Sequence, residues 1–262
     1  MSNTTSFTTA AAGPCRRAKR TFVAVAAGAL LLATMATPVL AIDKVYSPNV
    51  TRGELEFEYS GSTTFDKNHD KDNLQSHETE LEYGLTDRLM LELNGSFEKQ
   101  PDQHLKSNAV GFGGRYQFFE QGENWMDSGL LLTYGRSTQS HQPDTVELKL
   151  LLEKQWGRFL HRANIGIEQE VDQYASGGPD RVFLWNSRYR YRAYFEPGFE
   201  IQSDFGKANE VHTFDQQQHY IGPAAFGEIL PHLKYEVAYY RGISDAASSG
   251  AARLLLEYEV YF

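Results

Sequence analysis

The stretch Glu54-Leu55-Glu56-Phe57-Glu58-Tyr59 alternates a carboxylate with an apolar or aromatic side chain at every position. A similar alternation returns at Glu78-Thr79-Glu80-Leu81-Glu82-Tyr83. Successive side chains of a β-strand point to opposite faces, so both stretches predict strands with one acidic face. Period-two alternation continues beyond them, and no convincing helical stripe follows Gly53. The predicted fold class is all-β.

The same alternation predicts twelve strands along the chain. They cover residues 53–60, 76–83, 88–97, 108–119, 129–136, 145–154, 159–169, 181–191, 196–205, 217–228, 233–243 and 251–262. The connections alternate in kind: 61–75, 98–107, 137–144, 170–180, 206–216 and 244–250 are long and polar, whereas 84–87, 155–158, 192–195 and 229–232 are short and 120–127 is a long exception. Long loops on one rim and short turns on the other are typical of outer-membrane β-barrels, with the short turns in the periplasm.

The apolar faces of the strands decide between a soluble and a membrane protein. A closed ring of twelve strands is too wide for an apolar core, so the alternatives are a soluble two-sheet sandwich and a barrel with lipid outside. Val146, Leu148, Leu150 and Leu152 share one face, and tilted strands of about ten residues can cross a membrane. Aromatic residues also gather near strand ends, as in interfacial girdles. The sequence therefore predicts a 12-stranded antiparallel transmembrane β-barrel over residues 53–262, in the bacterial outer membrane.

The N-terminal region predicts export. A basic cluster at residues 16–20 precedes the apolar stretch 21–36, and Val39 and Ala41 fit a signal peptidase site. We expect residues 1–41 to be a cleaved signal peptide and residues 42–52 to be a periplasmic segment. The alternative, a membrane anchor, needs about 20 apolar residues. The C-terminal alternation ending at Phe262 resembles the signal that such barrels present to their insertion machinery.

Composition narrows the partners. Residues 1–41 hold four of the 25 basic side chains and none of the 34 acidic ones, which leaves residues 42–262 with a formal net charge of −13. Such a chain should repel nucleic acid. The single cysteine, Cys15, lies in the predicted signal peptide, so disulfides and thiolate metal sites are not expected in the mature chain. The expected partners are outer-membrane lipid, the insertion machinery and small solutes, without a cofactor.

Three segments resemble a known family. Residues 83–89, residues 218–223 and residues 233–247 are similar to parts of the proteobacterial barrels named for the MetA pathway of phenol degradation. That family is described as outer-membrane transporters, and the resemblance implies a barrel over most of residues 53–262 without known binding residues. A weaker likeness to the barrel half of copper-resistance B proteins lacks their Met- and His-rich segment.

Fifteen charged residues are predicted to line the lumen, because they lie on the face opposite the apolar one. They are Glu54, Glu56, Glu58, Glu78, Glu80, Glu82, Glu92, Arg115, Lys149, Arg162, Arg188, Arg190, Glu200, Glu257 and Glu259. If the first and last strands pair, the acids of four strands form one arc, and the bases face it. Carboxylates on neighbouring strands should share protons or bind cations. This lining fits either a cation-preferring path for small solutes or an interior closed by salt bridges.

Other candidate sites are weaker. A lipid hydrolase would need a serine and an orienting partner near His161, and the sequence shows no such set. His69 and His77, with nearby aspartates, could bind metal, but a solvated charged loop explains them as well. We therefore predict no enzyme, no catalytic residue, no cofactor site and no metal site. The glycines within residues 111–114 lie inside a strand, where they permit close packing or curvature.

Two details of register are also predicted. A hairpin centred near Tyr194 would place Arg188 opposite Glu200, and Asn186 opposite Gln202, in the lumen. On the lipid face, the same register places Tyr189 opposite Phe199 and Phe183 opposite Phe205. Pro223 lies within a predicted strand of a closed barrel, and it should mark a bulge or a strand end, because proline cannot donate to the ladder.

Overall fold

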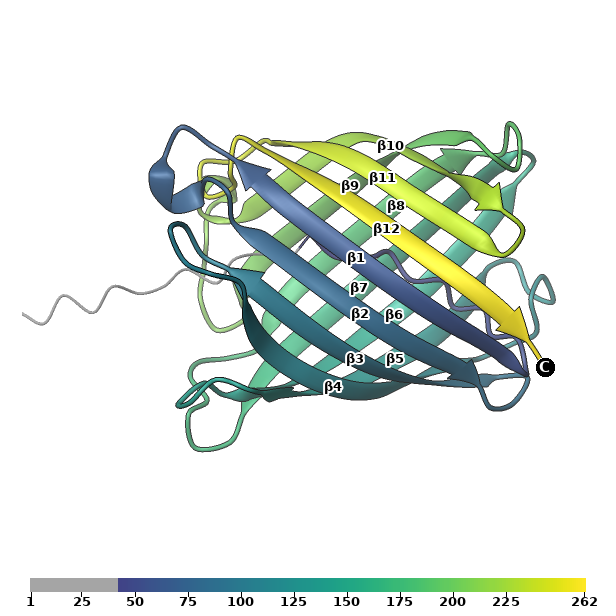
Figure 1. Cartoon of the computed structure of the whole chain (residues 1–262), viewed down its shortest axis with the longest axis horizontal. Helices are drawn as coiled ribbons and strands as arrows, with labels where there is room; N and C mark the ends of the chain where they lie inside the picture. The colour runs from purple at the N-terminus through teal and green to yellow at the C-terminus, as the bar shows by residue number, and fades with distance from the viewer. Residues whose placement is uncertain (1–41) are drawn as a thin grey trace, which may run out of the picture. The chain divides into compact units, whose positions relative to one another are not determined.

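The computed structural model describes residues 42–262, and the predicted signal peptide lies outside these residues. Twelve antiparallel strands form a closed barrel in chain order, with β1 paired to β12 (Figure 1). The strands are β1 Glu54–Phe65, β2 Gln75–Gly84, β3 Leu89–Lys99, β4 Lys106–Gln117, β5 Asp127–Ser137, β6 Asp144–Trp156, β7 Phe159–Val171, β8 Asp180–Tyr189, β9 Glu196–Lys207, β10 Gln218–Leu230, β11 Leu233–Gly242 and β12 Gly250–Tyr261. The predicted fold is confirmed, and β1 ends five residues later than expected.

The barrel is apolar outside and polar inside. Phe112, Leu93 and Ile165 are exposed on the outer face, whereas Glu82, Glu200 and their lumen neighbours are buried. A soluble protein would bury the first set and expose the second, so this surface requires lipid. No helix among residues 42–262 is long and apolar enough to cross a membrane.

The register of β8 and β9 differs from the prediction. Asn186 lies opposite Glu200, Leu184 opposite Gln202, and Arg188 opposite Gly198. The predicted partners are therefore wrong by two positions, although each residue keeps its predicted face because the strand period is two. The turn explains the shift. Arg192 and Phe195 form an isolated bridge that is one residue out of register with the strands.

Pro223 does not produce the predicted bulge or strand end. β10 continues through it, and its register with β11 is the same at Ile221 and Ala224. Gly222 and Pro223 have partners on β9 but none on β11, as the missing N–H of proline requires. The register shift in this strand pair lies between Glu228 and Leu230.

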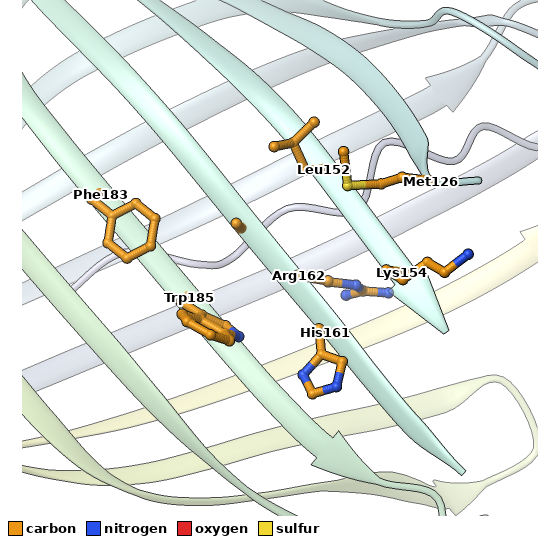
Figure 2. A pocket seen from close by; sticks show the side chains of 8 residues that line it. Met126, Leu152, Lys154, His161, Arg162, Phe183 and Trp185 are labelled. Carbon is orange, nitrogen blue, oxygen red and sulfur yellow. The ribbon is translucent and has the colours of Figure 1, made fainter. Parts of the chain in front are cut away.

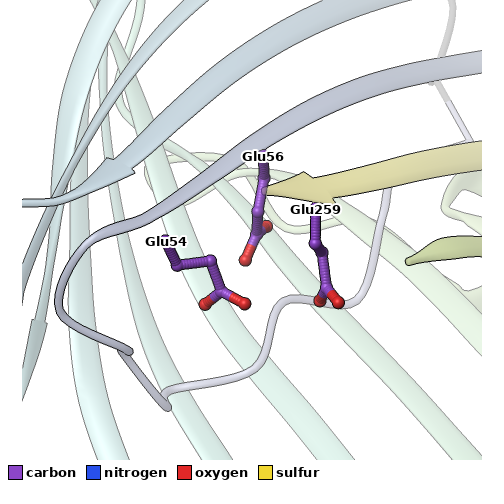
Figure 3. A group of neighbouring side chains, drawn as sticks. All are labelled: Glu54, Glu56 and Glu259. Atoms are coloured by element: carbon purple, nitrogen blue, oxygen red, sulfur yellow. The ribbon is translucent and has the colours of Figure 1, made fainter. Parts of the chain in front are cut away.

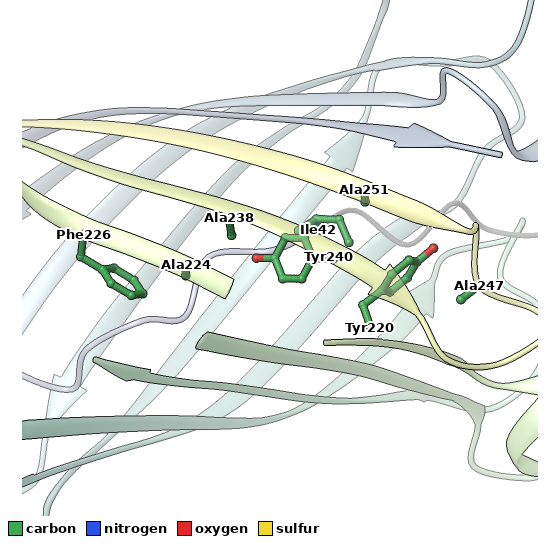
Figure 4. Packing of buried hydrophobic residues seen from close by; sticks show 8 residues of the cluster. All are labelled: Ile42, Tyr220, Ala224, Phe226, Ala238, Tyr240, Ala247 and Ala251. Atoms are coloured by element: carbon green, nitrogen blue, oxygen red, sulfur yellow. The ribbon is translucent and has the colours of Figure 1, made fainter. Parts of the chain in front are cut away.

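Residues 42–50 run inside the barrel rather than in the periplasm as the sequence predicted. They form no helix or strand, and Figure 1 shows them as the purple thread behind β1 and β12. Ile42 packs in the lumen among Tyr220, Tyr240 and Ala251 (Figure 4). We call residues 42–50 the lumen segment. Within residues 42–52, only Thr51 and Arg52 are exposed, and they lie at the periplasmic rim.

A glycine reverses the chain where the lumen segment leads into β1. Gly53 has a φ of 78°, a conformation that residues with a Cβ rarely adopt. The Gly53 N–H donates to the Gly84 carbonyl oxygen at 2.8 Å, and the Phe262 N–H donates to the Gly53 carbonyl oxygen at 3.0 Å. The entry of the lumen segment is thus fixed to the first turn and to the end of β12.

Candidate functional site

The lumen brings together most of the predicted charged residues. The glutamates of β1, β2 and β3 and those of β12 lie on adjacent strands, with Glu56 directly between Glu82 and Glu259. Arg115 reaches this arc from β4 and pairs with Glu82. Lys149, Arg162, Arg188 and Glu200 also face the lumen. Arg190 does not, because β8 ends at Tyr189 and Arg190 is exposed in the turn.

Two side-chain amides hold the backbone of the lumen segment. Gln202 accepts from the Asp43 N–H at 3.0 Å and donates to the Asp43 carbonyl at 2.8 Å. Asn164 accepts from the Tyr46 N–H at 2.7 Å and donates to the Tyr46 carbonyl at 3.0 Å. Each amide therefore binds both backbone polar groups of one residue, as a neighbouring β-strand would. We call Gln202 and Asn164 the amide clamps.

Other lumen residues bind further backbone groups of the segment. Arg253 donates to the Asp43 carbonyl, Arg115 donates to the Ser47 carbonyl at 3.0 Å, and Gln117 accepts from the Val50 N–H at 2.8 Å. Pro48 favours an extended conformation at Ser47. Because a closed barrel has no free strand edge, side chains must satisfy any chain that runs through it.

Lys44 supplies the positive charge within the acidic arc. Its Nζ lies 2.5 Å from a carboxylate oxygen of Glu58, 3.2 Å from Glu80 and 3.3 Å from Glu82. Carboxylates buried this closely would repel one another without a cation. The predicted cation of the arc is therefore a side chain of the protein itself.

Tyr46 occupies the centre of the same charged group. Its hydroxyl donates to Glu80 at 2.7 Å, and the ammonium groups of Lys44 and Lys149 lie 4.7 Å and 5.3 Å from its ring centroid. The Arg115 guanidinium is 5.9 Å away. A cation over an aromatic face is attracted by the ring quadrupole. Tyr46 thus contacts both signs of charge.

The part of the lumen wall on β9, β11 and β12 pairs its charges within its own strands. Arg253 on β12 pairs with Glu200 at 2.8 Å and with Glu236 at 3.0 Å, and Tyr240 donates to Glu200. We call Arg253, Glu200, Glu236 and Tyr240 the wall cluster. Its charges are paired between strands, whereas Glu58 and Glu80 of the acidic arc take their cation from the lumen segment.

Burial shows that the lumen is closed at this depth. Glu82, Asn164, Gln202 and Glu200 have an exposed fraction of 0%. A water-filled passage would leave such side chains accessible. Buried charges are tolerated when they are paired and hydrogen-bonded, and the lumen segment supplies those partners. The interior therefore matches the predicted salt-bridged alternative.

Sequence reasoning missed several residues of this site. Lys44 lay in a segment assigned to the periplasm, and neither Arg253 nor Asn164 was named as a lumen residue. Gln202 was placed in the lumen, but without its contact with Asp43. Asn164 shares a strand face with Arg162, and Arg253 shares one with Glu257. Strand parity would therefore have placed these side chains in the lumen. No signal in the sequence pointed to their contacts with residues 42–50.

One acidic group has the spacing of a metal site. Within residues 42–262, the carboxylates of Glu54, Glu56 and Glu259 lie within 4.8 Å of one another (Figure 3). Lys234 already pairs with Glu259, and Tyr261 donates to Glu259 at 3.1 Å. Outside the lumen, the His69 ring lies 3.0 Å from a carboxylate oxygen of Asp102, and the His77 ring forms a hydrogen bond with the Tyr59 hydroxyl. The two histidines therefore have separate partners and do not form one site.

A shallow pocket lies on the lipid face. A cavity of about 200 Å³ lies beside His161, Phe183 and Trp185, near the short turns (Figure 2). The structure places a serine that the sequence reading missed, because Ser187 on β8 is directly opposite His161 on β7. The Nδ1 atom of His161 has no hydrogen-bond partner among the described residues. The orienting partner of a hydrolase triad is therefore missing around His161 in this part of the chain.

The barrel is similar to solved outer-membrane proteins. The COG4313 outer membrane channel from Pseudomonas putida F1 matches with a TM-score of 0.60 and 15% sequence identity, over 85% of this chain and 100% of that one. The NanC porin matches with a TM-score of 0.50 and 8% identity, over 79% and 99%. No protein-family model and no curated protein matches the chain.

These likenesses show a shared fold. Together with the lipid-facing surface, they define the class: this chain is a β-barrel of the bacterial outer membrane.

Proposed function

We propose that this protein is an outer-membrane channel for small polar solutes, and that its lumen segment is the gate. The observation that carries this proposal is the position of Lys44, a single cation of the lumen segment that pairs with three buried carboxylates. When the segment leaves, these carboxylates and the bases beyond them would line a hydrated path. The resemblance to the phenol-degradation family points the same way, because that family is described as transporters.

The second candidate is a structural barrel that never opens. The amide clamps favour it, because they satisfy the backbone of a permanently seated segment. The two candidates differ in whether the segment can leave the lumen.

Single-channel recording in planar bilayers separates the two candidates. The wild type should be mostly closed, whereas Lys44→Glu should conduct steadily because it adds a carboxylate to the acidic arc. Lys44→Arg keeps the charge and serves as the matched control, with wild-type behaviour expected. A folded Lys44→Glu variant without current would support the structural barrel.

A further inference from the structure

We propose that the lumen is a binding site for extended peptides, and that residues 42–50 occupy it as an internal ligand. This inference rests on the proposed function, because a free peptide can enter only after the lumen segment has left. It also names a substrate class for the channel, namely short peptides with a basic residue.

The amide clamps carry the argument. Gln202 and Asn164 each bind one N–H and one C=O of the same residue, at 2.7–3.0 Å. An amide that pairs with both groups recognises a peptide unit and ignores its side chain. Asp43 and Tyr46 are three positions apart, which is roughly 10 Å in an extended chain. The two clamps therefore set the spacing of an extended peptide.

Three neighbouring positions select side chains. The carboxylates of Glu58, Glu80 and Glu82 surround the side chain of Lys44 and favour a basic residue there. Two positions later, the Tyr46 hydroxyl donates to Glu80, and the Lys44 and Lys149 ammonium groups lie over the Tyr46 ring. These contacts favour tyrosine at that position.

The third selected position is that of Ile42. This side chain lies among Tyr220, Ala224, Tyr240 and Ala251, which favours an apolar residue. The expected ligand thus reads apolar, acidic, basic, apolar, aromatic, because Asp43 lies 3.8 Å from Lys149 and Val45 is buried.

A tethered ligand competes strongly with a free one. A short linker gives an effective concentration of about 1 mM, so wild-type protein should resist peptide at lower concentrations. Lys44→Glu removes this competition in the full-length chain, because residue 44 then places a negative charge among Glu58, Glu80 and Glu82.

The experiment adds the nonapeptide of residues 42–50 to full-length Lys44→Glu protein in planar bilayers. We expect reversible block of the current at micromolar peptide. Two control peptides, one of scrambled order and one with glutamate in place of its lysine, should block at least about tenfold more weakly. Equal block by the scrambled peptide would overturn the proposal.

Variants of the clamps test backbone recognition. In the Lys44→Glu background, Asn164→Leu or Gln202→Leu should weaken block by about tenfold, since two hydrogen bonds are lost. Asn186→Leu is the matched control, because Asn186 is a fully buried lumen amide whose side-chain atoms bind no described residue. It should leave block unchanged. Equal effects of all three substitutions would show that the clamps do not recognise peptide.

Anisotropy of a dye-labelled nonapeptide, with Lys44→Glu protein in detergent, measures binding without current. Binding that depends on the clamps, but with no conductance, would keep this inference and refute the channel. Conductance without binding or block would keep the channel and refute this inference.

Discussion

The two walls of the lumen balance buried charge in different ways. The wall cluster pairs Arg253 of β12 with Glu200 of β9 and Glu236 of β11, whereas the acidic arc of β1–β3 and β12 takes one of its cations from Lys44 of the lumen segment. A wall that is balanced internally stabilises the barrel itself. A wall that takes its cation from the lumen segment stabilises the position of that segment. Under the proposed function, the first wall is structural and the second holds the gate.

Removing each cation in turn should separate these roles, with the largest effect at Lys44. Lys44→Met leaves Glu58 and Glu80 without a cation, while Glu82 keeps Arg115, and loss of one partner from a buried ion pair costs about 3 kcal/mol. The open probability in planar bilayers should therefore rise by about a hundredfold. An unchanged open probability would mean that the acidic arc does not hold the segment.

The equivalent change in the wall cluster should act on stability. Arg253→Met leaves Glu200 and Glu236 buried without their cation, so the free energy of unfolding should fall by about 3 kcal/mol. Denaturant titration, followed by the heat-modifiable gel migration expected of such barrels, measures this loss. Opening should increase less than in Lys44→Met, because Arg253 gives the segment one hydrogen bond, to the Asp43 carbonyl. The comparison fails if Arg253→Met opens the channel more than Lys44→Met does.

Charge selectivity should follow the exposed arc. Once the segment has left, Glu56, Glu80 and Glu82 would favour cations over anions in a narrow passage. Replacing all three with glutamine in the Lys44→Met background should reduce this preference while folding is nearly intact. Reversal potentials under a salt gradient decide the matter. Anion preference before the replacement, or no change after it, would contradict the predicted selectivity.

A matched pair of tyrosines should show the smallest effect. Tyr46→Phe removes the hydrogen bond to Glu80, worth about 1 kcal/mol, so opening should increase by less than about tenfold. Tyr240→Phe removes a similar bond to Glu200 within the wall cluster and the bond from Gln202 at 3.2 Å, and it should change opening less than Tyr46→Phe does. Recordings of both variants provide the test, and a larger response to Tyr240→Phe would reverse the assignment of the two walls.

Strand alternation predicted the fold because it depends only on local chemistry. The repeat at residues 54–59 fixes which side chains face lipid, and neither a shift of two in the β8–β9 pairing nor the continuous strand at Pro223 alters that assignment. The turn at residues 190–195 was harder to predict, because its irregular pairing depends on how two strands close rather than on either strand.

The contents of the lumen could not be read in the same way. Residues 42–50 form no strand and show no strong pattern, so a periplasmic location suited them equally well. Their position is set by contacts with Asn164, Gln202 and the acidic arc, which are distant in sequence. The charged lining was therefore predictable, whereas its closure by Lys44 and Tyr46 required the structure.

Thiol accessibility in the lumen tests the central claim most directly. Residues 42–262 contain no cysteine, and Leu151 is a fully buried lumen residue that packs with Tyr46. The account predicts that a small water-soluble thiol reagent modifies Leu151→Cys slowly in the otherwise wild-type chain. Modification should be at least about tenfold faster when Lys44→Glu is added. Rapid modification in both proteins, or slow modification in both, would contradict a lumen that the segment closes and can leave.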